Sequence, residues 1–258
     1  GDYRPLLPFL ADVPVGTLFL ELCTPRAGEI DVLAELPRAT RIGVGVVNQK
    51  LDDVEAVDVI EADDDVRVVL LEGAGPSFCS GADLNDFGTA SSIVESRRGR
   101  HELDVWGRMS TFEKPMIASL HGYTLGAGLE MSLMCDFRVA ADDALLGLPE
   151  VGLGYLPSAG GSQTMPRLIG KGRALEMILT GDPIPASRAL DFGIVQRVVP
   201  LSELASESLV LAQRLAAMPP RALQLTKHAV VQGLDLTLAQ GLQLESILGA
   251  RLRAPGGG

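Results

Sequence analysis

The sequence has few residues that could bind a metal ion or form a disulfide framework. Its three cysteines, Cys23, Cys79 and Cys135, are far apart in apolar surroundings, and no pair has the CxxC spacing of a zinc or redox motif. The three histidines show no ligand spacing with one another or with the cysteines. We therefore expect no metal site, and we expect reduced, buried thiols as in cytosolic proteins. A catalytic role for one cysteine is the less favoured alternative.

Positive charge and long apolar runs are also scarce. The formal net charge is −11, which argues against nucleic acid and anionic membranes as partners, because both favour a basic surface. A local basic patch could still bind an anionic group. No apolar run approaches the roughly 18 residues of a membrane-spanning helix. The first residues, GDYRPLLPFLADVP, lack a basic region followed by an apolar core, so we expect no signal peptide and a cytoplasmic protein.

The remaining composition is that of a soluble globular protein, with 47% hydrophobic and 21% charged residues. Its 258 residues allow one large domain or two small ones. The first 60 residues alternate between strand-like and helix-like segments. The expected order is a strand at Thr17–Cys23, a helix at Glu29–Leu36, a strand at Arg41–Asn48 and a helix at Leu51–Ile60.

Part of this first region resembles the C-terminal barrel of the cobalamin-independent methionine synthase family. The resemblance covers about residues 7–58 and rests on TPRAG and RIGVGVVNQK. The zinc-binding cysteine and histidine motifs of that family have no counterpart here, so no methyltransferase function is carried over. Two βα units cannot close an eight-unit barrel. We expect residues 1–60 either to complete the sheet of the following domain or to form an appendage.

The pattern changes from Glu61 onward. A glycine-rich turn, Gly122–Gly128, is expected between a strand and a buried helix, and the helices after residue 200 are expected to pack on the body or on a neighbouring subunit. The expected strands are Val66–Glu72, Met116–Leu120, Phe137–Ala141, the short Ala144–Leu148 and Ile194–Val199; the expected helices are 91–112, Leu129–Cys135, 171–182, Ala186–Phe192, Leu201–Met218, Arg221–Gln232 and Leu236–Leu252.

Two glutamates stand out as candidates for proton transfer. Glu130 lies in the apolar segment LEMSLM, and Glu150 follows Pro149 in another apolar segment. Burial raises the pKa of a carboxyl group and prepares it for proton transfer near neutral pH. The alternative for Glu130 is a carboxylate favoured by the helix dipole. The alternative for Glu150 is a turn or a helix cap.

Small residues after two strands offer backbone N–H groups to a ligand. Ser80-Gly81-Ala82 and Gly126-Ala127-Gly128 each follow a strand, and the second precedes a helix, whose N-terminus favours negative charge. Two amides that converge on one carbonyl oxygen would form an oxyanion hole; tight turns without a ligand are the alternative. Gly160-Gly161, after Pro157, is a further glycine pair, for which an ordinary turn is one interpretation. Lys114 and the arginines of residues 97–108 could face phosphates, or form a solvated surface.

Taken together, the motifs from about Glu61 to Leu252 resemble the enoyl-CoA hydratase/isomerase (crotonase) superfamily. The motifs are ADDDVRVVLLEGAG, SFCSGADL, KPMIASLHGYTLGAGLEMSLMCDFRVA, LLGLPEVGLGYLPSAGGSQTMPRLIG and ALDFGIVQRVVP. The resemblance implies an α/β fold with a ββα spiroid core and a C-terminal helical region, here with an atypical N-terminal segment. It also implies binding of acyl-CoA and stabilisation of a thioester enolate.

The resemblance assigns roles to particular residues. The oxyanion donors would be the N–H groups of Ala82 and Ala127. Glu130 would orient and deprotonate the water that adds at C3, and Glu150 would give the proton to C2 from the same face. Because isomerases of the superfamily typically keep one working glutamate, the pair favours an enoyl-CoA hydratase. The implied substrate-binding residues are Ser80, Gly81, Asp83, Leu84, Gly126, Pro149, Pro157, Gly160 and Gly161.

The same resemblance divides the chain and names its partners. Residues 61–200 would be the catalytic core, and residues 201–258 a C-terminal helical region that stops before the closing helix of the family. Coenzyme A would be part of the substrate, with no separate cofactor, and the assembly would be a homotrimer or hexamer. A delta-isomerase or another crotonase reaction is one alternative, and a non-catalytic acyl-CoA-binding subunit is another. The length of the acyl chain and the pathway are not defined by the sequence.

Overall fold

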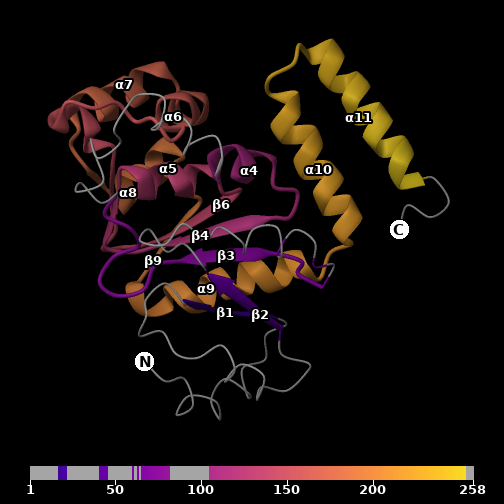
Figure 1. Ribbon diagram of the computed structural model, residues 1–258, viewed down its shortest axis with the longest axis horizontal. Coiled ribbons are helices and arrows are strands. Elements are labelled where there is room, and N and C mark those ends of the chain that lie inside the picture. The colour runs from indigo at the N-terminus through magenta and orange to yellow at the C-terminus, as the bar shows by residue number, and fades with distance from the viewer. Residues whose placement is uncertain are drawn as a thin grey trace, which may run out of the picture.

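A computed structural model provides the fold of the chain (Figure 1). The residues that it describes are 17–21, 41–45, 60, 63, 65–81 and 105–253.

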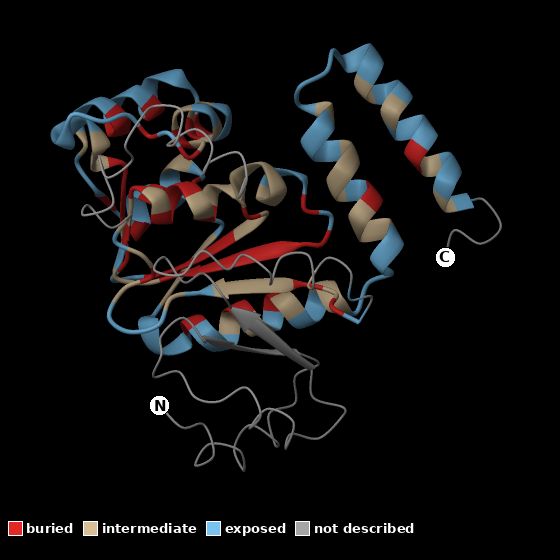
Figure 2. Ribbon diagram, in the orientation of Figure 1, coloured by how far each residue is buried: buried red, intermediate tan, exposed pale blue. Residues whose placement is uncertain are grey.

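A four-stranded parallel sheet lies at the centre of the molecule. Its strands are β3 (Val69–Glu72), β4 (Met116–Leu120), β6 (Phe137–Ala141) and β9 (Arg197–Val199), in the spatial order β3-β4-β6-β9. Every residue of β4 is buried (Figure 2), as expected for an inner parallel strand that is covered on both faces. The predicted strands are therefore confirmed, with β3 and β9 shorter than expected.

Different helices cover the two faces of this sheet. Helix α9 (Leu201–Ala216) packs Leu204 and Leu211 against Ile117 and Val139 on one face. On the opposite face, alternate residues of β4 join the larger core that includes α5, α6, α7 and α8, which lie on the other side of the sheet in Figure 1. The alternation of side chains along β4 thus divides the apolar interior into two clusters.

A second, smaller sheet follows directly from the first. Its strands are β5 (Tyr123–Leu125), β7 (Leu145–Gly147) and β8 (Ile184–Pro185), with β5 and β7 parallel and β7 and β8 antiparallel. The expected glycine turn at Gly122–Gly128 therefore contains a strand, because Thr124 pairs both with β7 and, through an isolated bridge, with Cys79. This sheet brings the loop after Cys79 beside the start of helix α5.

The helices after residue 200 agree with their predictions within a few residues. Two elements near the candidate site were not expected, the 3-10 helix η4 and helix α6. Besides α9, the bounds of the described helices are α4 (Val105–Thr111), α5 (Ala127–Met134), η4 (Pro149–Leu153), α6 (Gly161–Ile169), α7 (Lys171–Thr180), α8 (Ala186–Phe192), α10 (Pro220–Gly233) and α11 (Leu238–Arg253).

The N-terminal strands form a sheet of their own. β1 (Thr17–Glu21) and β2 (Arg41–Gly45) are paired in parallel, and in the strands that the structure describes β2 is not a member of the four-stranded sheet. The expected helix at Glu29–Leu36, nearly all of Leu51–Ile60 and residues 91–104 lie outside the described residues. Within the described part of the chain, no helix has the length and apolar character needed to cross a membrane.

Candidate active site

The N-terminus of helix α5 forms one wall of the site. Gly126 precedes the helix with φ 53° and ψ −126°, a backbone conformation that requires glycine. The Gly126 amide donates to the carbonyl of Gly147 at 2.9 Å, which fixes this turn to strand β7. Ala127 is the first helical residue, so its N–H has no acceptor within the helix. Among the described residues, none accepts a hydrogen bond from this N–H group. Ala127 thus offers a donor at the positive end of a helix dipole.

The loop that follows Cys79 lies against the same turn. A side chain at Gly128 would collide with the carbonyl group and side chain of Cys79, so glycine allows the close approach. The Leu125 amide donates to the Cys79 carbonyl at 2.9 Å. Gly81, with φ 119°, places its Cα 3.8 Å from the position of a Cβ built on Gly126. The two predicted donor loops are therefore neighbours.

The structure describes part of the first donor loop. Ser80 and Gly81 are described, and Ser80 is exposed. Ala82, Asp83 and Leu84 lie outside the described residues. The predicted oxyanion donor of this loop, the Ala82 amide, therefore stays a prediction.

Glu130 is buried one turn along helix α5 and is held by two backbone amides. Only 3% of its surface is exposed. Its Oε1 accepts hydrogen bonds from the amides of Ala159 at 2.9 Å and Gly161 at 2.8 Å. Gly161 begins helix α6, so the carboxyl group lies at that helix N-terminus. Two N–H donors and the positive end of a helix dipole stabilise a carboxylate. A Cβ at Gly161 would lie 2.9 Å from Oε1 of Glu130, which explains the glycine.

Glu150 occupies a different environment, on the 3-10 helix η4. Its Oε1 lies 3.1 Å from the position of a Cβ on Gly126, so the carboxyl group faces the N-terminus of α5. Its Oε2 is buried and has no hydrogen-bond partner among the described residues. Burial raises the pKa of Glu150, a hydrogen bond with its own backbone lowers it, and the charge of Glu130 raises it further. A raised pKa favours the protonated form of Glu150 more than in an exposed glutamate.

The two carboxyl groups are close enough for the charge of Glu130 to raise the pKa of Glu150, and they differ in chemistry. Glu130 has the contacts of a carboxylate that can accept a proton, and Glu150 those of an acid that can donate one. Ala127 directly follows Gly126, and the carboxyl group of Glu150 faces Gly126. Sequence analysis missed the Ala159 amide as a contact of Glu130; the signal was the small residue in PSAGG, which allows the loop to approach the carboxylate.

The remaining predicted residues surround this pair. Pro149 is the first residue of η4, and Pro157 is buried in the loop that leads to Ala159. Gly160 caps helix α6 with φ 112°, and a side chain there would collide with the Cε of Met134. These residues shape the loop that delivers the amides to Glu130.

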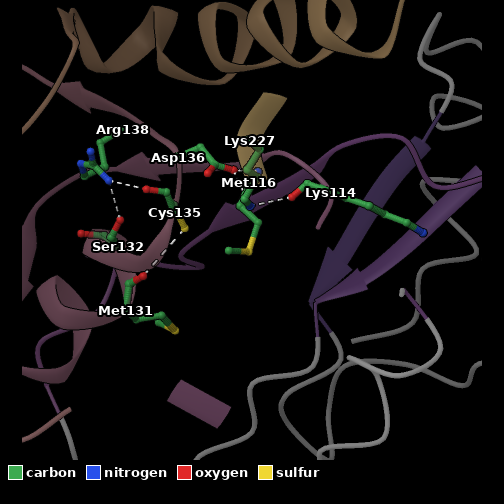
Figure 3. A network of polar contacts seen from close by, with 8 residues as sticks. All are labelled: Lys114, Met116, Met131, Ser132, Cys135, Asp136, Arg138 and Lys227. Atoms are coloured by element: carbon green, nitrogen blue, oxygen red, sulfur yellow. Dashed lines mark hydrogen bonds and ion pairs between the residues drawn. The ribbon is translucent and has the colours of Figure 1, made fainter. Parts of the chain in front are cut away.

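The two roles predicted for Lys114, a contact with phosphates and a place on a solvated surface, are both wrong. It is buried, and its Nζ donates to the carbonyls of Ile60 and Asp63 at 2.6 Å each, so it neither lies on a solvated surface nor faces an open phosphate site. In Figure 3 it lies beside the ion pair of Lys227 and Asp136, whose Nζ and Oδ2 are 2.8 Å apart. Within the described part of the chain, no three histidine, cysteine, aspartate or glutamate side chains are placed to hold a metal ion.

Comparison with known proteins finds a matching family model, similar sequences and a similar solved structure. A family model described as enoyl-CoA hydratase/isomerase matches residues 48–252. The short-chain-enoyl-CoA hydratase of Clostridium acetobutylicum is 38% identical over 72% of each chain, and the 2,3-dehydroadipyl-CoA hydratase of Escherichia coli is 37% identical over 78% of each.

A solved structure provides the third likeness, at the level of the fold. An enoyl-CoA hydratase subunit from Geobacillus kaustophilus superposes with a TM-score of 0.74 at 40% identity, covering 78% of this chain and 77% of that one. The likeness confirms the predicted α/β fold with its C-terminal helical region. The family match begins at residue 48, so the resemblance of residues 7–58 to methionine synthase stays a prediction.

Proposed function

Because the chain belongs to the enoyl-CoA hydratase/isomerase family, we propose that it catalyses the reversible syn addition of water to a trans-2-enoyl-CoA, with Glu130 and Glu150 as the proton-transfer groups. The product is a 3-hydroxyacyl-CoA. The observation that carries the proposal is the contrast between the two carboxyl groups. Glu130 accepts hydrogen bonds from two amides, whereas Glu150 has a raised pKa and a buried oxygen without a hydrogen-bond partner among the described residues.

The first step forms the bond between the water oxygen and C3. Glu130 accepts a proton from the water as its oxygen attacks C3, and the electron pair of the C2–C3 double bond moves onto the thioester. The resulting enolate carries its negative charge on the carbonyl oxygen. The amides of Ala159 and Gly161 hold Glu130 in place, so the base does not have to be oriented during the reaction.

The enolate needs fixed hydrogen-bond donors for its oxygen. The Ala127 amide supplies one at the positive end of helix α5, and the Ala82 amide is proposed as the second. The loop after Cys79 lies against this helix start, which supports the pairing of the two donors.

The second step returns a proton to carbon. Glu150 donates its proton to C2, becomes a carboxylate, and releases the 3-hydroxyacyl-CoA. Proton exchange with solvent then deprotonates Glu130 and protonates Glu150, which restores the starting state. Burial of Glu150 supports this role, because it raises the pKa of the acid toward neutral pH.

The acyl group and the assembly also belong to this proposal. One relative is named for short-chain and another for dehydroadipyl substrates, at nearly equal identity, so the acyl chain is left general. No cofactor besides the coenzyme A of the substrate is proposed, and the protein is proposed to act in the cytoplasm.

We propose a homotrimer or hexamer because the C-terminal helices expose apolar side chains, with Val230 60%, Leu234 79%, Leu238 80% and Leu242 55% exposed. Light scattering would give the mass of the assembly. A Leu238→Glu variant is expected to shift it toward the monomer.

An absorbance assay with crotonyl-CoA tests the catalytic proposal. The enoyl-thioester band should decay when the protein is added, and 3-hydroxybutyryl-CoA should be the product by mass spectrometry. Ala127→Pro removes the donor, while proline remains compatible with the first helical position. We expect kcat to fall by about 10²-fold.

Binding of the thioester without turnover would contradict the proposal and favour a non-catalytic subunit. Conversion of a 3-enoyl-CoA without hydration would favour an isomerase.

A further inference from the structure

A buried arginine lies behind the catalytic helix. Arg138 is the second residue of β6 and only 4% exposed. Its guanidinium group donates to the carbonyls of Ser132 at 3.0 Å and Cys135 at 2.6 Å, at the C-terminal end of α5 (Figure 3). It also donates to the carbonyl of Ile194, before strand β9. One side chain therefore joins the end of the helix to the sheet.

The charge of Arg138 has no acidic partner among the described residues. The nearest candidate, Asp136, uses its Oδ2 to accept from the Met116 amide at 2.7 Å and from the Nζ of Lys227 at 2.8 Å. Burial lowers the pKa of Arg138, and the charges of Cys135 and Asp136 offset part of this lowering. A buried cation without a counterion is costly, and fold stability alone is often served as well by an apolar residue. Its partners here are backbone carbonyls at the negative end of a helix dipole.

The opposite end of the same helix carries the proposed chemistry. Ala127 is its first residue, and Glu130 lies one turn further on. A cation at the C-terminus offsets the negative end of the dipole, which leaves the positive end to act on charge that develops beside Ala127.

We propose that Arg138 is a positioning residue for the reaction: its buried guanidinium fixes the C-terminal end of α5, and its charge strengthens the stabilisation of the enolate at the N-terminal end. This inference rests on the proposed function of Ala127. It concerns a residue that does not touch the substrate.

The expected size follows from the length of the helix. Helix α5 has eight residues, which at about 1.5 Å per residue separates its ends by about 12 Å. A unit charge acting over that distance at an effective dielectric constant of about 20 changes a rate by about tenfold. Because the enolate is formed only along the reaction, the effect should lie in kcat and not in KM.

Three substitutions separate the charge from the hydrogen bonds. Arg138→Lys keeps the charge and loses donors, Arg138→Gln keeps donors and loses the charge, and Arg138→Met loses both. With crotonyl-CoA, we expect kcat to fall about tenfold or more for the glutamine and methionine variants, with KM within about twofold. The lysine variant should stay within about threefold of the unmodified chain, which is the rescue expected of a charge effect.

A control for stability uses the opposite face of the sheet. Leu211→Ala in α9 removes a buried side chain far from α5 and should lower the free energy of unfolding with kcat unchanged. Chemical unfolding of all four variants would give the free energy of unfolding of each one, which can then be compared with its kcat. If the methionine variant does not fold, the comparison of the lysine and glutamine variants decides.

Three results would overturn the inference. The first is a glutamine variant with unchanged kcat, and the second is a lysine variant as slow as the glutamine variant. The third is an equal fall in kcat in the Leu211→Ala control and in an Arg138 variant that has the same free energy of unfolding. Absence of turnover in the unmodified chain would instead overturn the proposed function and this inference with it.

Discussion

The surroundings of Glu130 and Glu150 show how one residue type acquires two chemical characters within one site. Around Glu130, the start of helix α6 delivers two amides to a single oxygen. Around Glu150, the short helix η4 leaves one oxygen buried without a partner among the described residues, and the pKa rises. At Glu130 two backbone amides donate to the carboxyl group, whereas at Glu150 burial is the largest cause of the raised pKa.

The largest expected effect comes from removing the base. Glutamine in place of Glu130 keeps an oxygen that accepts from the Ala159 and Gly161 amides, so the fold should be retained. It cannot accept a proton from water, so we expect kcat for hydration to fall by about 10³-fold to 10⁴-fold. Steady-state kinetics with crotonyl-CoA would measure the change. Nearly unchanged hydration of crotonyl-CoA by this variant would break the comparison, because it would show that Glu130 is not the base.

A somewhat smaller effect is expected from the acid. Glu150→Gln resembles the protonated carboxyl group in shape but cannot release a proton to C2. We expect kcat to fall by about 10²-fold to 10³-fold. Proton exchange at C2 of a saturated acyl-CoA in deuterated water, followed by mass spectrometry, would isolate this step. Exchange at an unchanged rate would show that another group delivers the proton.

A steric test acts on the contact between Glu130 and helix α6. A methyl group at Gly161 would lie 2.9 Å from both Oε1 and Cγ of Glu130, so Gly161→Ala should displace the base. We expect kcat to fall about tenfold, because misplacement of a catalytic group weakens it. Gly172→Ala is the matched control, since a side chain at that helical glycine meets nothing within 4 Å. Equal kcat in the two variants would contradict the proposed orientation.

The smallest effect concerns stability and pH. Because the pKa of Glu150 is raised above its ordinary value of 4.5 in the folded chain, the folded state binds this proton more tightly than the unfolded state does. The resulting stability is fully present below about pH 4.5 and is lost as the pH rises through the folded pKa. Urea unfolding across this range should show the unmodified chain losing stability relative to Glu150→Gln. A difference that does not change with pH would contradict the raised pKa.

Local patterns in the sequence were sufficient for most of the fold. The fully apolar run at Met116–Leu120 and the helices after residue 200 were placed nearly correctly, because burial on both faces and helical periodicity are properties of short segments. Strand β5 was missed, because three residues between glycines form a strand only through their partners in β7. Helix α6 was missed because Gly160 and Gly161 suggest a turn. Gly160 is required by its positive φ and the nearby Met134, and Gly161 by the carboxyl group of Glu130.

The candidate site was accessible from the sequence mainly through its motifs. Spacing alone gave two glutamates and two glycine loops, and the resemblance joined them. The contact of Oε1 of Glu130 with the Ala159 and Gly161 amides could not be predicted, because it connects positions 29 and 31 residues apart. The burial of Lys114 was missed for the same reason, since its acceptors, Ile60 and Asp63, come from a distant segment.

The burial of Lys114 provides a way to detect unfolding of the protein in solution. An amine-reactive reagent attacks an accessible lysine in its neutral amine form. The Nζ of Lys114 is buried and donates to two carbonyls, whereas Lys171 is exposed. Acylation at low reagent concentration should therefore label Lys171 first and reach Lys114 only after that part of the chain opens. Mass spectrometry of the peptides that contain Lys171 and Lys114 would show the order of labelling, and labelling of Lys114 would report loss of the native core.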